Sequence, residues 1–224
     1  MSQKIDFKKS LRGYQAPTGK YQIVDIPDRR YLMIDGQGDP NTSEEYPASL
    51  AALYPVAYAL KFASKRELDR DYVVPPLEGL WWAEDMSVFT SSRDTSKWQW
   101  TLMLLVPDWI DDESIFAAIA AVRAKSSPQR LDALRLETLV EGRCVQTLHL
   151  GPFEEEARTL EPMHRDFIPS HGLEPTGKHH EIYLSDPRRT AARKLRTILR
   201  QPVGQAKPRG LQPGAAPPEV PPRA

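Results

Sequence analysis

The sequence has almost no cysteine, no excess of charge of either sign and no long apolar run. Cys144 is the one cysteine among 224 residues, so the chain forms no disulfide within itself, which fits a reducing compartment. Lys plus Arg and Asp plus Glu number 30 each, which leaves no net charge. General binding to nucleic acid requires a basic field, so a neutral chain argues against it.

Apolar stretches are also short. No run approaches the ~20 apolar residues that span a bilayer. The polar start, Met1–Gln15, lacks the apolar segment of a signal peptide. We therefore expect a cytoplasmic protein, monomer or homodimer, that binds neither nucleic acid nor a membrane.

Several motifs of well-known chemistry are missing. His179 and His180 are adjacent, so on a strand they point to opposite sides, and no HxH or HxxxH pair occurs. The stretch Gly36–Asp39, GQGD, lacks the GxGxxG pattern and is followed by no Walker lysine. No GxSxG nucleophile motif is present. The sequence thus predicts neither a metal ion nor a cofactor.

The end of the chain differs in composition from the rest. Residues 201–224 hold seven of the 21 prolines, with Gly and Ala between them. Such a segment buries too little apolar surface to offset the entropy of ordering it. We expect one folded domain over residues 1–203 and a disordered, proline-rich tail over 204–224. The alternative for the tail is a proline-rich ligand of a partner domain.

The remaining sequence indicates a mixture of strands and helices. Apolar stretches predict strands at 21–27, 29–38, 78–85, 98–107 and 179–185, and helical spacing predicts helices at 43–62, 111–125 and 152–172. Pro55 lies inside the first helix and is expected to kink it or remove one backbone bond. Residues 135–151 divide at Glu141-Gly142 into two strands that we expect to form a hairpin. The basic run from Arg188 to Arg200 predicts a solvated helix face.

The order of these elements repeats. The segment YLMIDGQGD, a helix and GLWWAE correspond to CVQTLHLGPF, a helix and HHEIYLS, although the two halves share negligible identity. The fold class predicted is α+β, with two related halves. Ligand sites favour the junction between such halves.

Aromatic side chains are the first candidates for a ligand site. Trp81 and Trp82 are adjacent on a strand, so one can pack in the core and the other can face a cleft. Trp100 and, four residues apart on the first helix, Tyr54 and Tyr58 are further candidates. Each has a plain structural alternative: tryptophans in the core, and tyrosines at the solvated edge of an amphipathic helix. The functional interpretation is an aromatic wall that stacks on a flat ligand.

Glu181 and Tyr183 carry the most distinctive pattern. They alternate with apolar residues in HHEIYLS, share one face of a strand and lie about 7 Å apart along it. A carboxylate beside a phenol and aromatic walls can act as a general base or attract a cation. A paired surface glutamate is the alternative that the spacing leaves open.

Several segments together resemble the GyrI-like small-molecule-binding proteins, in particular their stand-alone bacterial subgroup. The matching segments are IDGQGDPN, LYPVAYALK, PLEGLWW, LMLLVPD and GKHHEIYLSDPRR…KLRTILRQPV. The resemblance covers nearly the whole chain except the tail, and Pro55 departs from it. It implies two βαββ halves related by a pseudo-twofold axis, with a multidrug-binding cleft that has aromatic walls and a central glutamate at the position of Glu181.

The resemblance also suggests an activity. Some stand-alone relatives are cyclopropanoid cyclopropyl hydrolases, which detoxify DNA-alkylating natural products by adding water to a strained ring. We therefore expect a hydrolase in which Glu181 activates water and a phenol from Tyr54, Tyr58 or Tyr183 donates to the dienone oxygen. A module that only binds drugs or metabolites is the alternative. A topoisomerase inhibitor, as the family name suggests, is disfavoured because a neutral chain offers no acidic surface that mimics DNA.

Overall fold

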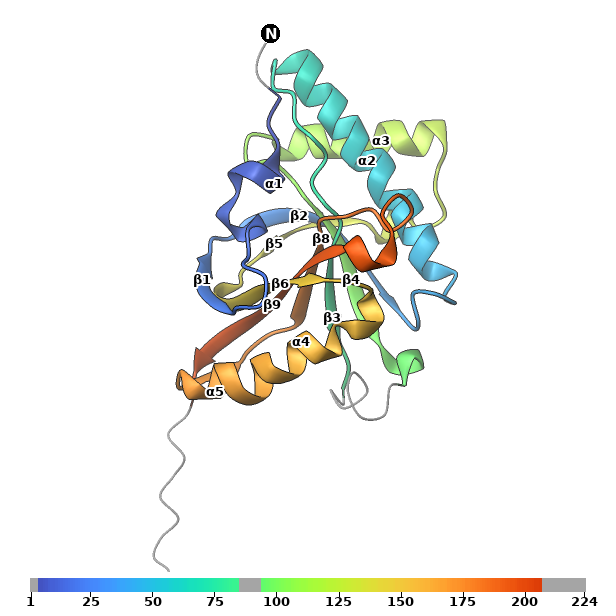
Figure 1. Cartoon of the computed structure of the whole chain (residues 1–224). Helices are drawn as coiled ribbons and strands as arrows, with labels where there is room; N and C mark the ends of the chain where they lie inside the picture. Colours follow the sequence, from blue (N-terminus) through green and yellow to red (C-terminus); the bar gives the residue numbers. More distant parts are fainter. Residues whose placement is uncertain (1–3, 85–93, 207–224) are drawn as a thin grey trace, which may run out of the picture.

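The computed structural model describes residues 4–84 and 94–206, so most of the predicted tail lies outside the described residues. Its main element is one antiparallel sheet, drawn in Figure 1 with the long helix α2 toward the top and α4 toward the bottom. In the described residues the strand order is β1-β6-β9-β8-β3-β4-β2-β5, and β7 (Leu173–Pro175) pairs with β9.

Two halves of equal topology make up the middle of this sheet. The first contains β2 (Arg29–Gln37), α2 (Glu45–Glu67), β3 (Glu78–Trp82) and β4 (Gln99–Leu105). The second contains β6 (Gly142–Leu150), a helical segment, β8 (His179–Tyr183) and β9 (Arg196–Gln205). The helical segment is built from η5 (Phe153–Glu155), α4 (Ala157–Pro162), η6 (Met163–Phe167) and α5 (Ile168–Ser170).

The order β6-β9-β8-β3-β4-β2 places equivalent strands symmetrically about the β3–β8 pair. The predicted α+β fold with two βαββ halves is therefore confirmed, with the pseudo-twofold axis between β3 and β8.

The remaining strands exchange partners between the halves. β1 (Gln22–Ile26) precedes β2 in sequence but pairs with β6, and β5 (Arg135–Leu139) precedes β6 but pairs with β2. The predicted hairpin at 135–151 is thus wrong. The local pattern marked both strands and their division correctly, but each strand finds its partner in the distant half of the chain.

These exchanges determine the shape of the sheet. β1 and β2 lie near opposite ends of the strand order, yet only two residues separate Ile26 from Arg29. Three residue steps reach at most roughly 11 Å, so the two ends of the sheet must approach each other. The short link between β5 and β6 imposes the same condition, and the sheet curls.

Alternation along the strands gives the sheet two faces. One face, here called the Glu181 face, carries His179, Glu181 and Tyr183 of β8, and the register with β3 adds Gly79 and Trp81. The other, here called the Glu78 face, carries the residues between them, including Glu78 and His180.

Helices cover the Glu181 face at its two ends. α2 packs on β2 and β4, and α3 (Asp112–Lys125) packs on α2. The α4 segment lies over β6, where His149 Nδ1 is 3.0 Å from the Thr159 hydroxyl and Met163 packs on Val145. The central strands β3 and β8 lie between these two covers (Figure 1).

Short helical turns complete the described chain. They are α1 (Phe7–Ser10), η1 (Arg12–Tyr14), η3 (Thr95–Lys97), η4 (Leu131–Ala133) and η7 (Ala192–Lys194).

The structure also shows the helix around Pro55 and the basic run from Arg188 to Arg200, for which the sequence made local predictions. α2 continues through Pro55 without a break, because its buried stripe, which includes Leu53, Val56 and Leu60, holds the helix on the sheet. The basic run does not form a helix face. Its last part is strand β9, and Arg200 is buried there because carboxylates of the core surround it.

Candidate functional site

Glu181 lies at the middle of the central strand β8. Its side chain is 14% exposed. The Tyr183 hydroxyl donates a hydrogen bond of 2.8 Å to Glu181 Oε2, and Trp81 Nε1 donates one of 3.0 Å to the Tyr183 oxygen. The three side chains form one hydrogen-bonded series from β3 to β8, which fixes the orientation of the carboxylate.

Gly79 makes room for this series. It pairs with Glu181 across β3 and β8, so a side chain there would stand beside the carboxylate. A Cβ atom at Gly79 would lie 2.9 Å from Trp81 Nε1 and 3.1 Å from the Tyr183 oxygen. The absence of a side chain therefore lets the indole and the phenol meet.

Two histidines adjoin Glu181. His179 Nε2 lies 3.6 Å from Glu181 Oε1, and neither ring nitrogen of this buried histidine has a hydrogen-bond partner among the described residues. His164 lies on η6 close enough to His179 for the two charges to interact. Burial, with a further contribution from His179, lowers the pKa of His164 to about 4. The His164 ring is therefore expected to be a neutral donor or acceptor at neutral pH.

A second carboxyl group reaches the same place from the helical side. Glu156 precedes α4, is 6% exposed, and its Oε1 has no hydrogen-bond partner among the described residues. Burial first, and then the charge of Glu181, raise the pKa of Glu156 well above its usual value. A buried polar atom without a partner is costly, which makes Glu156 a candidate member of the site.

Aromatic rings surround the two carboxyl groups. The Phe153 ring meets the Tyr183 ring edge to face at 5.7 Å, and Trp98 meets Trp81 in the same way at 5.9 Å. Tyr46, on α2, packs its edge against Trp100 at 5.4 Å. Burial and the charge of Glu181 raise the pKa of Tyr46, which shows that this phenol belongs to the Glu181 environment.

The structure brings together only part of the residue set predicted from the sequence. Glu181, Tyr183 and Trp81 meet. Trp82 points to the Glu78 face, where the Lys178 ammonium lies 3.1 Å from the centre of its ring. Trp100 is on the Glu181 face but fully buried, because its ring lies over Gly36, where a Cβ atom would overlap it.

The two helix tyrosines stand at the edge of this region. Tyr54 is half-buried, and the tilted rings of Tyr54 and Tyr58 lie 6.5 Å apart. Tyr58 is 47% exposed and stacks on Phe62 further along α2. Burial raises the pKa of the Tyr54 phenol, and the charges of Arg188 and Asp186, in the turn after β8, lower and raise it respectively. Tyr54 thus lies near this turn, whereas Tyr58 is exposed.

Sequence reasoning missed Glu156, His179 and Tyr46 as members of the site. Glu156 lies three residues after Phe153 and four before Leu160, on the stripe expected to face the sheet, and that position was the available signal. His179 shares the strand face of Glu181 by simple alternation. Tyr46 precedes Leu50 by four residues and extends the apolar stripe of α2 toward its start.

The Glu78 face holds a different polar group, which is fully paired. His180 Nε2 lies 2.9 Å from Glu78 Oε2, and His180 Nδ1 lies 2.8 Å from Glu141 Oε1. Arg200 donates to Glu141 Oε2 at 2.8 Å. The hydroxyls of Tyr14 and Tyr31 donate to Glu78.

Charge is balanced within this network. Burial opposes a charge on His180, but the Glu141 and Glu78 carboxylates outweigh it and raise the pKa of the imidazole. Burial likewise opposes ionised Glu141, but His180 and Arg200 lower its pKa to about 2. The Arg200 guanidinium and the His180 imidazole thus face the Glu141 carboxylate from two sides. We assign this network a structural role.

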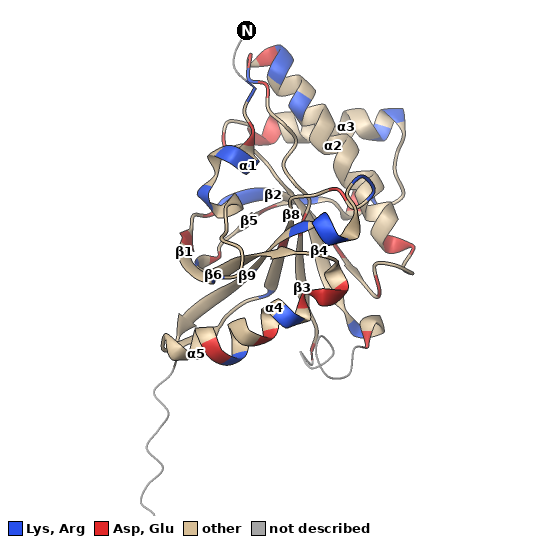
Figure 2. Cartoon of the chain, viewed as in Figure 1, with Lys and Arg blue, Asp and Glu red and all other residues tan. Residues whose placement is uncertain are grey.

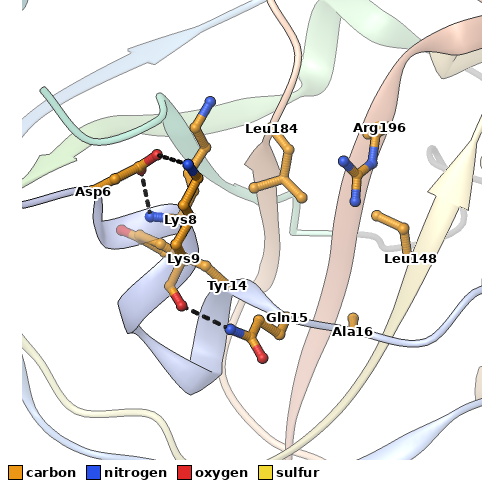
Figure 3. A pocket seen from close by; sticks show the side chains of 9 residues that line it. All are labelled: Asp6, Lys8, Lys9, Tyr14, Gln15, Ala16, Leu148, Leu184 and Arg196. Carbon is orange, nitrogen blue, oxygen red and sulfur yellow. Dashed lines mark hydrogen bonds and ion pairs between the residues drawn. The ribbon is translucent and has the colours of Figure 1, made fainter. Parts of the chain in front are cut away.

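Two hollows of about 400 Å³ each are found away from Glu181. One lies on the Glu78 side, where α1 and the following turn approach β9 (Figure 3). In Figure 3 Leu184, directly after β8, and Arg196, at the start of β9, lie opposite Lys8 and Gln15. The second lies between β6 and the α4 segment and includes Tyr21 and Thr147. Neither hollow contains a residue predicted from the sequence as part of the site.

Charged residues of both signs occur on the helices, and in α3 the acids lie at its start and the bases at its end (Figure 2). In the described ranges no three His, Cys, Asp or Glu side chains gather in a way that would hold a metal ion. None of the helices within those ranges has the length and apolar character needed to cross a bilayer.

Comparisons with known proteins agree with this architecture. An uncharacterised conserved protein from Listeria innocua is 42% identical, with a TM-score of 0.81 over 90% of this chain and 100% of the other. A structure described as a hydrolase from Listeria innocua is 40% identical, with a TM-score of 0.77 over the same shares. The C-terminal domain of EcmrR, at 10% identity and a TM-score of 0.53, covers 84% of this chain and 98% of its own, and shares the fold.

A search of curated proteins found no match. The family model of the GyrI-like small molecule binding domain matches residues 19–203, which include both halves and the whole Glu181 site. The chain therefore belongs to the GyrI-like small-molecule-binding family.

Proposed function

We propose that this protein binds planar hydrophobic or cationic small molecules at the Glu181 site and hydrolyses those that carry a strained cyclopropane ring. The observation that carries the proposal is the series Trp81–Tyr183–Glu181, which orients a largely buried carboxylate among aromatic rings. The description of the 40% identical Listeria protein as a hydrolase supports a hydrolytic activity.

Glu181 is suited to the role of general base. Its Oε2 accepts the hydrogen bond from Tyr183, and its Oε1 is left without a hydrogen-bond donor among the described residues. A water molecule bound to Oε1 would lose a proton to the carboxylate while its oxygen attacks the cyclopropane carbon. General base catalysis of this kind contributes roughly 10²–10⁴-fold in rate.

Tyr183 is a positioning residue in this scheme. Its hydroxyl hydrogen is donated to Glu181 and its oxygen accepts from Trp81, so the phenol has no hydrogen left to donate to a substrate oxygen. Burial first, and then the charge of Glu181, raise the pKa of Tyr183, which keeps it protonated. Another group must therefore donate to the dienone oxygen of the substrate as it becomes negative.

The surroundings favour flat and positively charged ligands. Trp81, Tyr183 and Phe153 supply ring surface, and an ionised Glu181 attracts a cation held against those rings. Natural products that alkylate DNA through a cyclopropane fused to a dienone combine a flat body with a strained ring. They are the substrate class that we propose.

Glu181→Gln tests the proposal. The protein is incubated with a cyclopropane-bearing dienone, and the ring-opened, hydrated product is followed by mass spectrometry. We expect the variant to be at least about 100-fold slower than the parent. Glu161→Gln, at an exposed helix position, serves as the control and should keep full activity. Equal rates for Glu181→Gln and the parent would exclude Glu181 as the base.

A binding module without chemistry is the second candidate. It is favoured by the buried polar atoms of His179 and Glu156, which require a ligand but no reaction. It predicts saturable quenching of tryptophan fluorescence, with the ligand recovered unchanged. Recovery of the hydrated product decides for the hydrolase.

A further inference from the structure

Glu156 is the buried acid that the general-base scheme leaves unused. Glu156 lies three residues after Phe153. Because the Phe153 ring contacts the Tyr183 ring, with centroids 5.7 Å apart, the start of the α4 segment lies on the Glu181 face. The side chain is 6% exposed and Oε1 has no hydrogen-bond partner in the described part of the chain. A carboxyl group in this position is shielded from water and close to a second carboxylate.

Two carboxyl groups in such a place do not both ionise easily, and the hydrogen bonds show which one does. Glu181 receives the Tyr183 hydroxyl, which stabilises its ionised form. Glu156 Oε1 has no hydrogen-bond partner among the described residues. Burial first, and then the charge of Glu181, raise the pKa of Glu156 against an opposing contribution from the Thr197 hydroxyl. Environments that separate two neighbouring carboxyl groups in this way assign one as base and the other as acid.

We propose that Glu156 is held as a neutral carboxylic acid and donates a proton to the substrate oxygen that becomes negative when the ring opens. The inference rests on the proposed hydrolase function and completes it, because Tyr183 cannot serve as that donor. It also fixes the substrate class more narrowly: the oxygen must be conjugated with the cyclopropane and lie on the helical side of Glu181.

The step balances with water as the co-reactant. The water oxygen forms a bond to the cyclopropane carbon and its proton passes to Glu181. The ring C–C bond breaks, and its electron pair moves through the dienone to the oxygen, which takes the proton of Glu156. Transfer of a proton from Glu181 to Glu156 then restores both groups. The net change is the addition of one water molecule.

The pH dependence follows from the groups around Glu156. They are Glu181 and Tyr183 of β8, Thr197 of β9 and Glu154 of its own turn. The reaction requires ionised Glu181 and neutral Glu156. The rate therefore falls at high pH as Glu156 loses its proton.

Glu156→Gln tests this inference, because glutamine keeps the size and the neutral state but has no proton to transfer. We expect an unchanged ligand affinity, judged by tryptophan fluorescence, and a single-turnover rate roughly 100-fold lower. The fall in rate at high pH should disappear. Glu155→Gln is the matched control on the same turn, since Glu155 is half exposed, and it should behave like the parent. Circular dichroism confirms that each variant is folded.

A second measurement makes the result independent of the hydrolase assay. Infrared difference spectra between the parent and Glu156→Gln should show the C=O band of a protonated carboxyl group at neutral pH. An unchanged rate and pH profile in Glu156→Gln, or the absence of this band, would overturn the inference. A parent protein that shows the band but never hydrolyses the dienone would overturn the proposed function instead, and with it the donor role, while supporting the neutral state of Glu156.

Discussion

His180 and Glu181 are neighbours in sequence and point to opposite faces of the sheet. The two faces differ in whether their buried polar groups have hydrogen-bond partners. On the Glu78 face each ring nitrogen of His180 meets a carboxylate, and Arg200 completes the charge balance. On the Glu181 face both ring nitrogens of His179 and one carboxyl oxygen of Glu156 have no hydrogen-bond partner among the described residues. Buried polar groups are normally paired. The difference therefore separates a paired face, to which we assign a structural role, from the face that we propose as the ligand site.

The largest effect should come from breaking the paired face. Arg200→Met leaves Glu141 buried without its guanidinium partner, and loss of one member of a buried pair costs about 3–5 kcal/mol. Urea denaturation of the parent and the variant measures the difference. Arg189→Met, at an exposed side chain, is the control and should leave stability unchanged. A loss no larger than that of the control would show that the network does not stabilise the fold.

The next effect should appear in activity more than in stability. Tyr183→Phe removes the donor to Glu181 Oε2 and the acceptor of Trp81 Nε1, which misorients the base. We expect hydrolysis to fall about tenfold and the free energy of unfolding to fall by about 1–2 kcal/mol, because one buried N–H loses its acceptor. Steady-state rates and urea curves on one preparation measure both. A large loss of stability with normal activity would reverse the assignment of the faces.

Glu156→Gln should stabilise the protein in a pH-dependent way. The pKa of Glu156 is raised in the folded state, so its contribution to stability is complete below the unfolded pKa and is lost as pH rises through the folded pKa. At high pH, each unit by which folding raises the pKa of Glu156 lowers the free energy of unfolding of the parent by about 1.4 kcal/mol. The gain from the variant should therefore be larger at pH 7 than at pH 4. Melting curves at the two values measure it, and an equal gain at both would contradict a buried neutral acid.

The smallest effect should be seen at Cys144, whose thiol we expect not to react in the folded protein. Cys144 is fully buried on the Glu78 face, and burial, with Glu141 nearby, raises the pKa of its thiol to about 12. Iodoacetamide at pH 8 should leave the folded protein unlabelled and label it after denaturation in urea. Mass spectrometry counts the adduct. Rapid labelling of the folded protein would show that this face opens readily.

The sequence predicted the parts of the molecule that depend on local pattern. Alternation in residues 179–183 placed Glu181 and Tyr183 on one face, and the repeat of element order predicted two βαββ halves. The resemblance to the family, carried by segments such as PLEGLWW and GKHHEIYLSDPRR, is confirmed by the match over residues 19–203.

The parts that were missed depend on contacts between distant segments. The exchange of β1 and β5 between the halves follows from curling of the whole sheet, which no local window contains. The opposition of Gly79 and Glu181 follows from the register of β3 on β8, and alternation alone does not give a register. Glu156 belonged to a run of three glutamates, and only packing against the sheet distinguishes it from its solvated neighbours.

The exchanged edge strands also restrict how the molecule can move. β1 joins β6 and β5 joins β2 through five residue pairs each, and both connections run from one half to the other. With the central β3–β8 pair, the halves are held together at three places rather than one. Swinging the halves apart as a hinge would break both edge ladders at once, so we expect a ligand to reach Glu181 by displacement of side chains and of the α4 segment while the sheet stays closed.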